Sequence, residues 1–141
     1  RRSTSGYLFL SSGGPISWAS TLQKLIALST VEAKLTVLAY TGREAVYLSN
    51  MLLELRLRSY FESVDIWGDN TGSLMLAAKA GYSTRTKHIA IRYHFLTELV
   101  SKGKIRLHHV PSASQLADVL TKFMTKATYN RLVDMVVNFT H

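Results

Sequence analysis

A long helical period is the feature of this sequence that most limits the fold. From about Thr30 to about Leu55, apolar residues recur at the spacing of one helix face, and they are Leu35, Leu38, Ala39, Ala45, Leu48, Leu52 and Leu55. Ser29 and Glu32 form a capping-box pattern, in which the Ser side chain accepts from the helix backbone and the Glu reaches back. Gly42 lowers the local helix propensity without ending the helix. The sequence therefore predicts one long amphipathic helix.

Strand-like runs lie on both sides of this helix. Tyr7–Leu10 and Ile16–Ala19 flank a Gly-rich turn and predict a hairpin, and the runs Val64–Trp67 and Lys104–Val110 predict two more strands. The other predicted helices are Ser73–Lys79, His88–Lys102, Gln115–Thr121 and Lys126–Phe139. The second of them has Ile91, Phe95 and Leu99 on one stripe and Gly103 as its C-terminal stop. The third is capped by Ser112 or Ser114. The order β-β-α-β-α-α-β-α-α predicts one α/β domain with a mixed sheet over residues 1–141.

The charge balance favours an acidic partner. The chain has 17 Lys and Arg against nine Asp and Glu, a formal net charge of +8. Such an excess favours phosphate-rich partners such as nucleic acid, although a soluble or assembly surface has the same composition. No apolar run approaches the roughly 20 residues that span a bilayer, no signal peptide is evident, and there is no Cys. We expect an intracellular protein, cytoplasmic or nuclear, that is neither secreted nor bound to a membrane.

Three of the few acidic residues lie where predicted strands or turns lead into helices: Glu32, Asp69 and Asp118. Each has a structural interpretation, because Glu32 completes the capping box, Asp69 forms a turn with Asn70, and Asp118 matches a helix dipole. Carboxylates at such junctions can also meet at one edge of an α/β sheet. Hard cations such as Mg²⁺ take oxygen ligands of this kind, usually completed by substrate phosphates. The three acids together therefore point to metal-assisted phosphodiester chemistry.

A basic cluster is the candidate nucleic-acid contact. It consists of Arg85, Lys87, His88, Arg92 and His94, and His88 and Arg92 share a helix face. Contact with phosphates and a solvated basic face are both open interpretations. His108 and His109 are neighbours on a strand and point to opposite faces, so at most one of them serves a single site. Trp18 and Trp67 are expected in the core.

Several longer motifs resemble one family. The runs LIALSTVEAKLTVLAYTGREAVYL and DIWGDNTGSLMLAAKAGYSTRTKHIAIRYHFLTELVSKGKIRLHHVPSASQLADVLTK are similar to the ribonuclease H domain of copia-type LTR retrotransposon polyproteins. The RSTSGY segment, its Gly-rich turn and the following ISW match the hairpin of that family. The blocks RTKHIAIRYHF and QLADVLTK are the distinctive ones, and the resemblance covers nearly the whole chain.

The resemblance implies a ribonuclease H-like mixed sheet flanked by helices, and hydrolysis of the RNA strand of RNA–DNA hybrids. In the family four carboxylates hold two Mg²⁺ (or Mn²⁺) ions. Glu32, Asp69 and Asp118 match the second, third and fourth of these acids by their position in the motifs. Asn70 is implied to contact a sugar hydroxyl, and the 2′-OH distinguishes RNA from DNA at such a site.

The first acid and its strand are absent from this chain. In the family they lie upstream of RSTSGY, on the strand in the middle of the sheet, and this chain begins at Arg1. We expect a partner chain or an upstream segment to supply that central strand, or the sheet to rearrange, because unpaired strand edges are costly.

The chain also departs from the family at single positions, which are Lys34, Leu35, Gly68, Thr71, Ala90 and Phe123. The changes at Lys34 and Ala90 remove acids near the presumed active face. We therefore expect impaired catalysis in this N-terminally truncated chain. The alternative is a non-catalytic, domesticated subunit that binds nucleic acid or protein within a larger complex.

Overall fold

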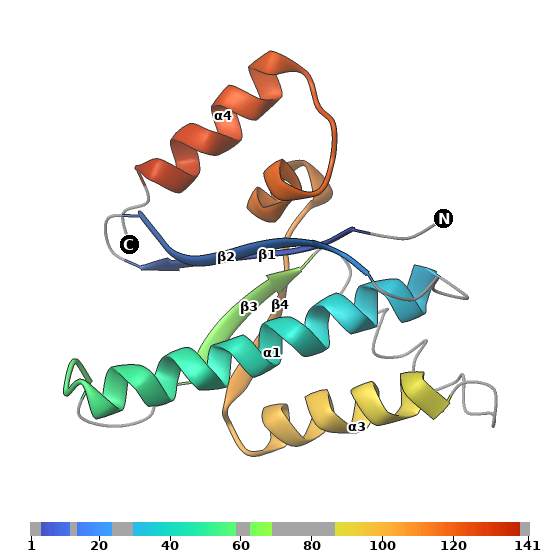
Figure 1. The fold of residues 1–141 in the computed structure, drawn as a ribbon, viewed down its shortest axis with the longest axis vertical. Coiled ribbons are helices and arrows are strands. Elements are labelled where there is room, and N and C mark those ends of the chain that lie inside the picture. Colours follow the sequence, from blue (N-terminus) through green and yellow to red (C-terminus); the bar gives the residue numbers. More distant parts are fainter. Residues whose placement is uncertain (1–3, 12–13, 24–29, 59–62, 69–86, 139–141) are drawn as a thin grey trace. The chain divides into compact units, whose positions relative to one another are not determined.

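The computed structural model describes residues 4–11, 14–23, 30–58, 63–68 and 87–138. These residues form a mixed α/β structure with three α-helices and two two-stranded sheets (Figure 1). The chain divides into two compact units, one comprising residues 1–27 and 111–141 and the other residues 28–110. The α/β class expected from the sequence is thus confirmed, and no closed five-stranded sheet occurs in the described ranges.

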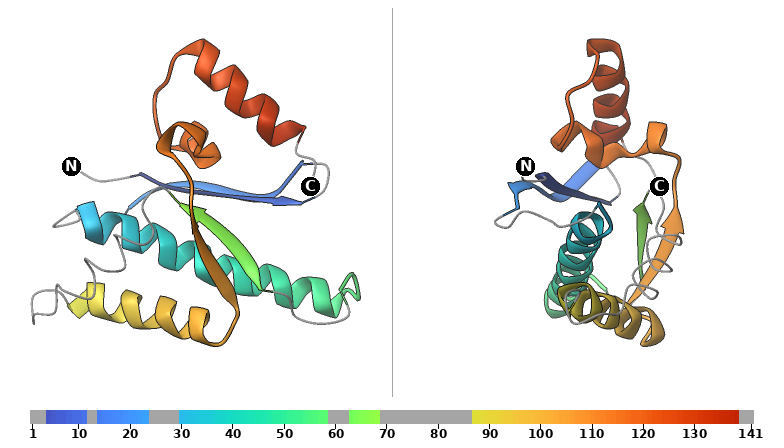
Figure 2. Two further views of the ribbon diagram at one scale, coloured as in Figure 1. Left: turned by 180° about the vertical axis from the view of Figure 1, so that it is seen from behind. Right: turned by 90° about the vertical axis from the view of Figure 1, so that its right-hand side faces the viewer.

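The unit of residues 28–110 is built on the predicted long helix, α1 (Thr30–Glu54). Its apolar stripe is buried where it was expected, at Leu35, Leu38, Ala39, Ala45 and Leu48. The helix α3 (Lys87–Ser101) packs against α1. The strands β3 (Val64–Gly68) and β4 (Ile105–His109) pair in parallel. Helix α1 contacts both strands, and α3 contacts β4. The two helices lie side by side in Figures 1 and 2.

Gly42 of α1 is buried and lies against α3. A Cβ added there would lie 3.1 Å from Leu99 Cδ1 and 3.4 Å from Leu96 Cδ2, which is tighter than ordinary van der Waals contact at the first atom. The glycine predicted only to weaken the helix therefore has a packing role, because it lets α3 approach the α1 backbone.

The ends of both helices follow the Schellman pattern, in which a backbone N–H bonds to a carbonyl five residues earlier. After α3, the Lys104 N–H donates to the Leu99 carbonyl at 2.9 Å, and Gly103 has φ +69°. Gly103 is thus confirmed as the helix stop. After α1, the Leu57 N–H donates to the Leu52 carbonyl at 2.9 Å, and Arg56 takes the left-handed φ of +57°.

Strands β3 and β4 present two different faces. Ile66 and Ile105 point to the covered face and are 6% and 0% exposed. The register pairs Asp65 with Arg106 and Trp67 with His108 on the opposite face. That second face is polar and aromatic, and the sequence pattern predicted only its strand character.

The other unit is a β-hairpin with the C-terminal helices. Strands β1 (Thr4–Ser11) and β2 (Gly14–Leu22) pair antiparallel, which confirms the predicted hairpin, and a bulge falls between Phe9 and Leu10. The short 3₁₀ segments η2 (Ser112–Ser114) and η3 (Leu116–Leu120) precede α4 (Lys126–Val137). Helix α4 contacts β2 and η3, and η3 contacts β1.

Several sequence expectations were wrong in detail. Ser112 and Ser114 do not cap a helix, because they form η2, and the N-cap position of η3 is Gln115 without a side-chain cap. Leu55 lies beyond the end of α1 and is 61% exposed. Ile91 is 57% exposed, because Ile89 and Leu96 form the buried face of α3. The helix expected at Ser73–Lys79 falls outside the described residues, and the single domain remains a prediction.

Candidate functional site

Glu32 lies in the first turn of α1, as the capping pattern predicted. Its side chain is half-buried, and its backbone carbonyl accepts a hydrogen bond from Thr36 Oγ1 at 2.8 Å. A carboxylate in the first helical turn is stabilised by the positive end of the helix dipole. Glu32 is therefore held in a defined place by α1, in the unit of residues 28–110.

Asp118 lies in η3, in the other unit. Its carbonyl accepts from the Thr121 and Lys122 N–H groups at 3.1 and 3.0 Å, so the short helix fixes its backbone. Its side chain is only 17% exposed, and Oδ2 lies 3.3 Å from Lys122 Nζ. The carboxylate thus has one cationic neighbour, one helical turn further along the chain.

The close approach of β1 to η3 depends on Gly6. A Cβ added at this position would clash with the Thr121 Cγ2 methyl group. Ser20 on β2 also donates to the Leu120 carbonyl at 2.6 Å. The hairpin and the Asp118-bearing segment therefore fit together through a glycine and one hydrogen bond.

The remaining predicted residues are only partly described. Asp69, Asn70 and Arg85 lie outside the described residues, as does the side chain of His88, whose backbone belongs to α3. In the described part of the chain no three His, Cys, Asp or Glu side chains form a group that could hold a metal ion. The donor type of Glu32 and Asp118 nevertheless suits a hard divalent cation, because both supply carboxylate oxygen.

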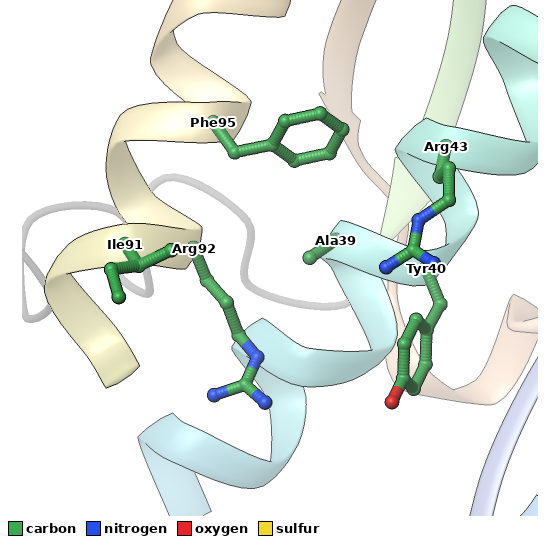
Figure 3. Close-up of a pocket in the computed structure, with 6 residues that line it drawn as sticks. All are labelled: Ala39, Tyr40, Arg43, Ile91, Arg92 and Phe95. Carbon is green, nitrogen blue, oxygen red and sulfur yellow. The ribbon is translucent and has the colours of Figure 1, made fainter. Parts of the chain in front are cut away.

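The described basic residues of α3 do not share one environment. Lys87 and His94 are exposed, and the His94 ring contacts the Tyr93 ring edge-on with centroids 5.6 Å apart. Arg92 is half-buried and lines a pocket between α1 and α3, together with Ala39, Tyr40, Arg43, Ile91 and Phe95. Figure 3 shows Arg92 and Phe95 extending from α3 toward α1, and Arg43 lying beside the Tyr40 ring.

A second polar group lies on the exposed face of β3 and β4. Asp65 Oδ1 is 2.8 Å from both Arg106 Nε and His108 Nε2. The His108 ring stacks on Trp67, with centroids 4.4 Å apart and 22° between the ring planes. The hydrogen bond from His108, followed by the charge of Arg106, lowers the pKa of Asp65 against the opposing effect of desolvation.

The sequence analysis did not predict this group. Both strands alternate between apolar residues and polar or aromatic residues, and this shared alternation was the signal that could have indicated a polar face. Trp67 and Trp18 were expected in the core and are instead 57% and 59% exposed, so that expectation was wrong. Trp67 faces outward because the parallel register places it beside His108 and on the side opposite Ile66.

Comparisons with known proteins show that this chain is similar in sequence to retrotransposon polyproteins. No protein-family model and no solved structure matches it. The chain is 36% identical over 136 residues to the retrovirus-related Pol polyprotein from transposon TNT 1-94 of Nicotiana tabacum, covering 96% of this chain and 10% of the relative. The corresponding polyproteins from transposons RE1 and RE2 of Arabidopsis thaliana are each 37% identical, over 134 and 127 residues, covering 95% and 90% of this chain and 9% of each relative.

The chain is therefore homologous, over nearly its full length, to a segment of copia-type retrotransposon Pol polyproteins. It spans about a tenth of the length of these relatives. No helix within the described ranges has the length and apolarity needed to cross a membrane.

Proposed function

We propose that the chain is a ribonuclease H domain that acts on the RNA strand of RNA–DNA hybrids inside the cell. The observation that carries the proposal is the homology to Pol polyproteins over 96% of the chain, because that stretch includes the blocks RTKHIAIRYHF and QLADVLTK. The pairing senses of the sheets support the proposal as well. The described strands form an antiparallel hairpin and a separate parallel pair, which agrees with the hairpin and the further strands that the resemblance implies.

Glu32, Asp69 and Asp118 would hold Mg²⁺ or Mn²⁺ in this proposal. Bound metal would supply an activated water and stabilise the leaving 3′ oxygen. The role of the chain is to position the carboxylates: α1 holds Glu32 in its first turn, and η3 holds Asp118 through two backbone hydrogen bonds. Lys122, 3.3 Å from Asp118, would compete with a cation for that carboxylate and weaken its binding.

The open strand edges supply the second part of the proposal. In the described ranges β1 pairs only with β2, and β3 only with β4, so each strand has one edge without a sheet partner. We infer that a partner chain or an upstream segment adds a strand to such an edge, because unpaired backbone groups favour pairing. That strand would also carry the first acid of the set, which Glu32, Asp69 and Asp118 leave open, so catalysis without it would be impaired.

A non-catalytic binding subunit is the second candidate. Lys34 is exposed two residues after Glu32, where the family motif has an acid, and Ala90 is half-buried where another acid is usual. The positive charge of the chain and the basic residues of α3 would remain useful for contact with nucleic acid after catalysis was lost. Arg85, Lys87, His88, Arg92, His94 and Asn70 are the proposed contacts.

The two candidates are separated by an assay of hybrid cleavage with an extended chain. The chain would be joined at its N-terminus to the segment that precedes the matched region in the tobacco relative, and a labelled RNA–DNA hybrid would be the substrate. Catalysis predicts Mg²⁺-dependent cleavage that is lost in Asp69→Asn. It also predicts that the matched control Asp134→Asn, an exposed acid of α4, cleaves like the parent. Binding of the hybrid without cleavage would refute the catalytic function and support the second candidate.

A further inference from the structure

We propose that the pocket between α1 and α3 binds a phosphate group of a nucleotide or of a nucleic-acid strand through Arg43 and Arg92. This deepens the nucleic-acid contact proposed above for Arg92 and adds Arg43 and Tyr40, which no sequence motif indicated. The cavity measures about 350 Å³ and lies wholly within the unit of residues 28–110. That volume is near the lower end of the roughly 300–1,000 Å³ of small-molecule sites.

The shape of the pocket follows from the packing of the two helices. Gly42 brings α1 close to Leu96 and Leu99 of α3, which closes the space one turn further along both helices. Ala39 is 7% exposed and has a short side chain, so it leaves room between the helices on the other side of that contact. Phe95 is half-buried and, with Ala39, gives the pocket an apolar wall.

The charge of the pocket is positive. Arg43 and Arg92 both line it, and neither forms an ion pair or a hydrogen bond with another residue in the described part of the chain. The Arg43 guanidinium carbon lies 5.4 Å from the centre of the Tyr40 ring, a cation–π contact that restrains the side chain at the rim. Two cations at one small concave site repel each other, and a bound anion would relieve this repulsion.

The chemistry of these groups favours phosphate over a simple anion. A guanidinium presents parallel N–H donors that match two oxygens of a phosphate group. Tyr40 is 46% exposed and also lines the pocket, and Figure 3 shows its hydroxyl at the end of the ring that points away from Arg43. Ile91 is 57% exposed and offers an apolar surface for a sugar or a base. A phosphate with an attached nucleoside would therefore use both the polar and the apolar sides of the pocket.

The inference is tested by binding measurements without metal, so that its outcome is independent of cleavage. Adenosine 5′-monophosphate, adenosine and a single-stranded oligonucleotide would be titrated into the full chain by NMR. Changes in the backbone signals of residues 39–43 and 91–95 are expected with the nucleotide but not with adenosine. The double variant Arg43→Gln/Arg92→Gln should weaken binding at least tenfold. The matched control Arg56→Gln/Lys126→Gln removes the same charge at exposed sites outside the pocket and should bind like the parent.

The arms of the experiment identify the source of the phosphate. Equal sensitivity of the nucleotide and the oligonucleotide to the double variant indicates a mononucleotide site. Sensitivity of the oligonucleotide alone indicates a backbone phosphate, and the salt dependence of its binding should then fall by about 0.7 per lost contact. Arg43→Lys keeps the charge and the fold but loses the paired donors, so it should bind more weakly than the parent. Equal losses in the pocket and control variants would overturn the proposal, because they would reflect net charge alone.

Discussion

Replacing Gly6 by alanine should destabilise the unit that contains Asp118, because β1 and η3 meet at this glycine. The added Cβ would clash with Thr121 Cγ2, so the Thr121 side chain must turn away or one of the two segments must shift. Overpacking of this kind costs about 1–3 kcal/mol, and replacing a glycine within a strand returns about 0.5–1 kcal/mol. We expect a net loss of about 1–2 kcal/mol in the free energy of unfolding, measured by urea denaturation.

Thr121→Ser provides the matched background for this test. The substitution keeps the hydroxyl but removes the Cγ2 methyl group, so Gly6→Ala should be neutral or slightly stabilising in the Thr121→Ser variant. The coupling energy between the two changes should therefore be about 1–3 kcal/mol, which is the overpacking cost and lies within the range for residues in direct contact. An equal loss in both backgrounds would refute the claim that the glycine is required by the approach of Thr121.

Three further predictions concern the other unit. Arg56 has φ +57° at the end of α1, so Arg56→Gly should raise the unfolding free energy by about 0.5–1 kcal/mol in urea titrations, and a loss would contradict the left-handed assignment. Leu96→Ala removes a side chain that is 0% exposed and should cost about 2–5 kcal/mol, against little change for exposed Leu57→Ala. The hydrogen bond with His108 lowers the pKa of Asp65 in the folded protein. The ionised Asp65 should therefore stabilise the fold at pH values above its ordinary pKa of 3.8, and this stabilisation should be lost as the pH falls through the lower pKa of the folded state. Because its side chain is 42% exposed, Asp65→Asn should cost less than about 1 kcal/mol near neutral pH and converge with the parent in acid, whereas a constant difference would argue against the ion pair.

Local periodicity was enough to predict the main helices and strands. The stripe from Leu35 to Leu48 is buried as expected, and Gly103 ends α3. The end of α1 could not be predicted in the same way, because Arg56 adopts a conformation that usually belongs to glycine. The face of α3 was assigned wrongly at Ile91, since several stripes on that helix are apolar and only the position of α1 decides which is buried.

In the candidate sites, too, local sequence patterns predict some features, whereas other features depend on how distant segments pack together. The place of Glu32 in the first turn of α1 followed from the capping pattern alone. Asp65 and His108 are 43 residues apart in sequence, and only the parallel register of β3 and β4 brings them within 2.8 Å. The pocket at Arg43 was missed for a related reason, because it depends on how two helices pack and not on either helix by itself.

The substrate preference of the extended chain tests the proposed function most directly. Three labelled duplexes of equal sequence would be compared: an RNA strand paired with DNA, the same RNA strand paired with RNA, and the corresponding DNA duplex. A ribonuclease H predicts Mg²⁺-dependent cutting of the RNA strand in the hybrid, with both other duplexes left intact and with activity lost in Asp69→Asn. Absence of cutting, or equal cutting of all three duplexes, would contradict the assignment of Glu32, Asp69 and Asp118 to a hybrid-specific nuclease.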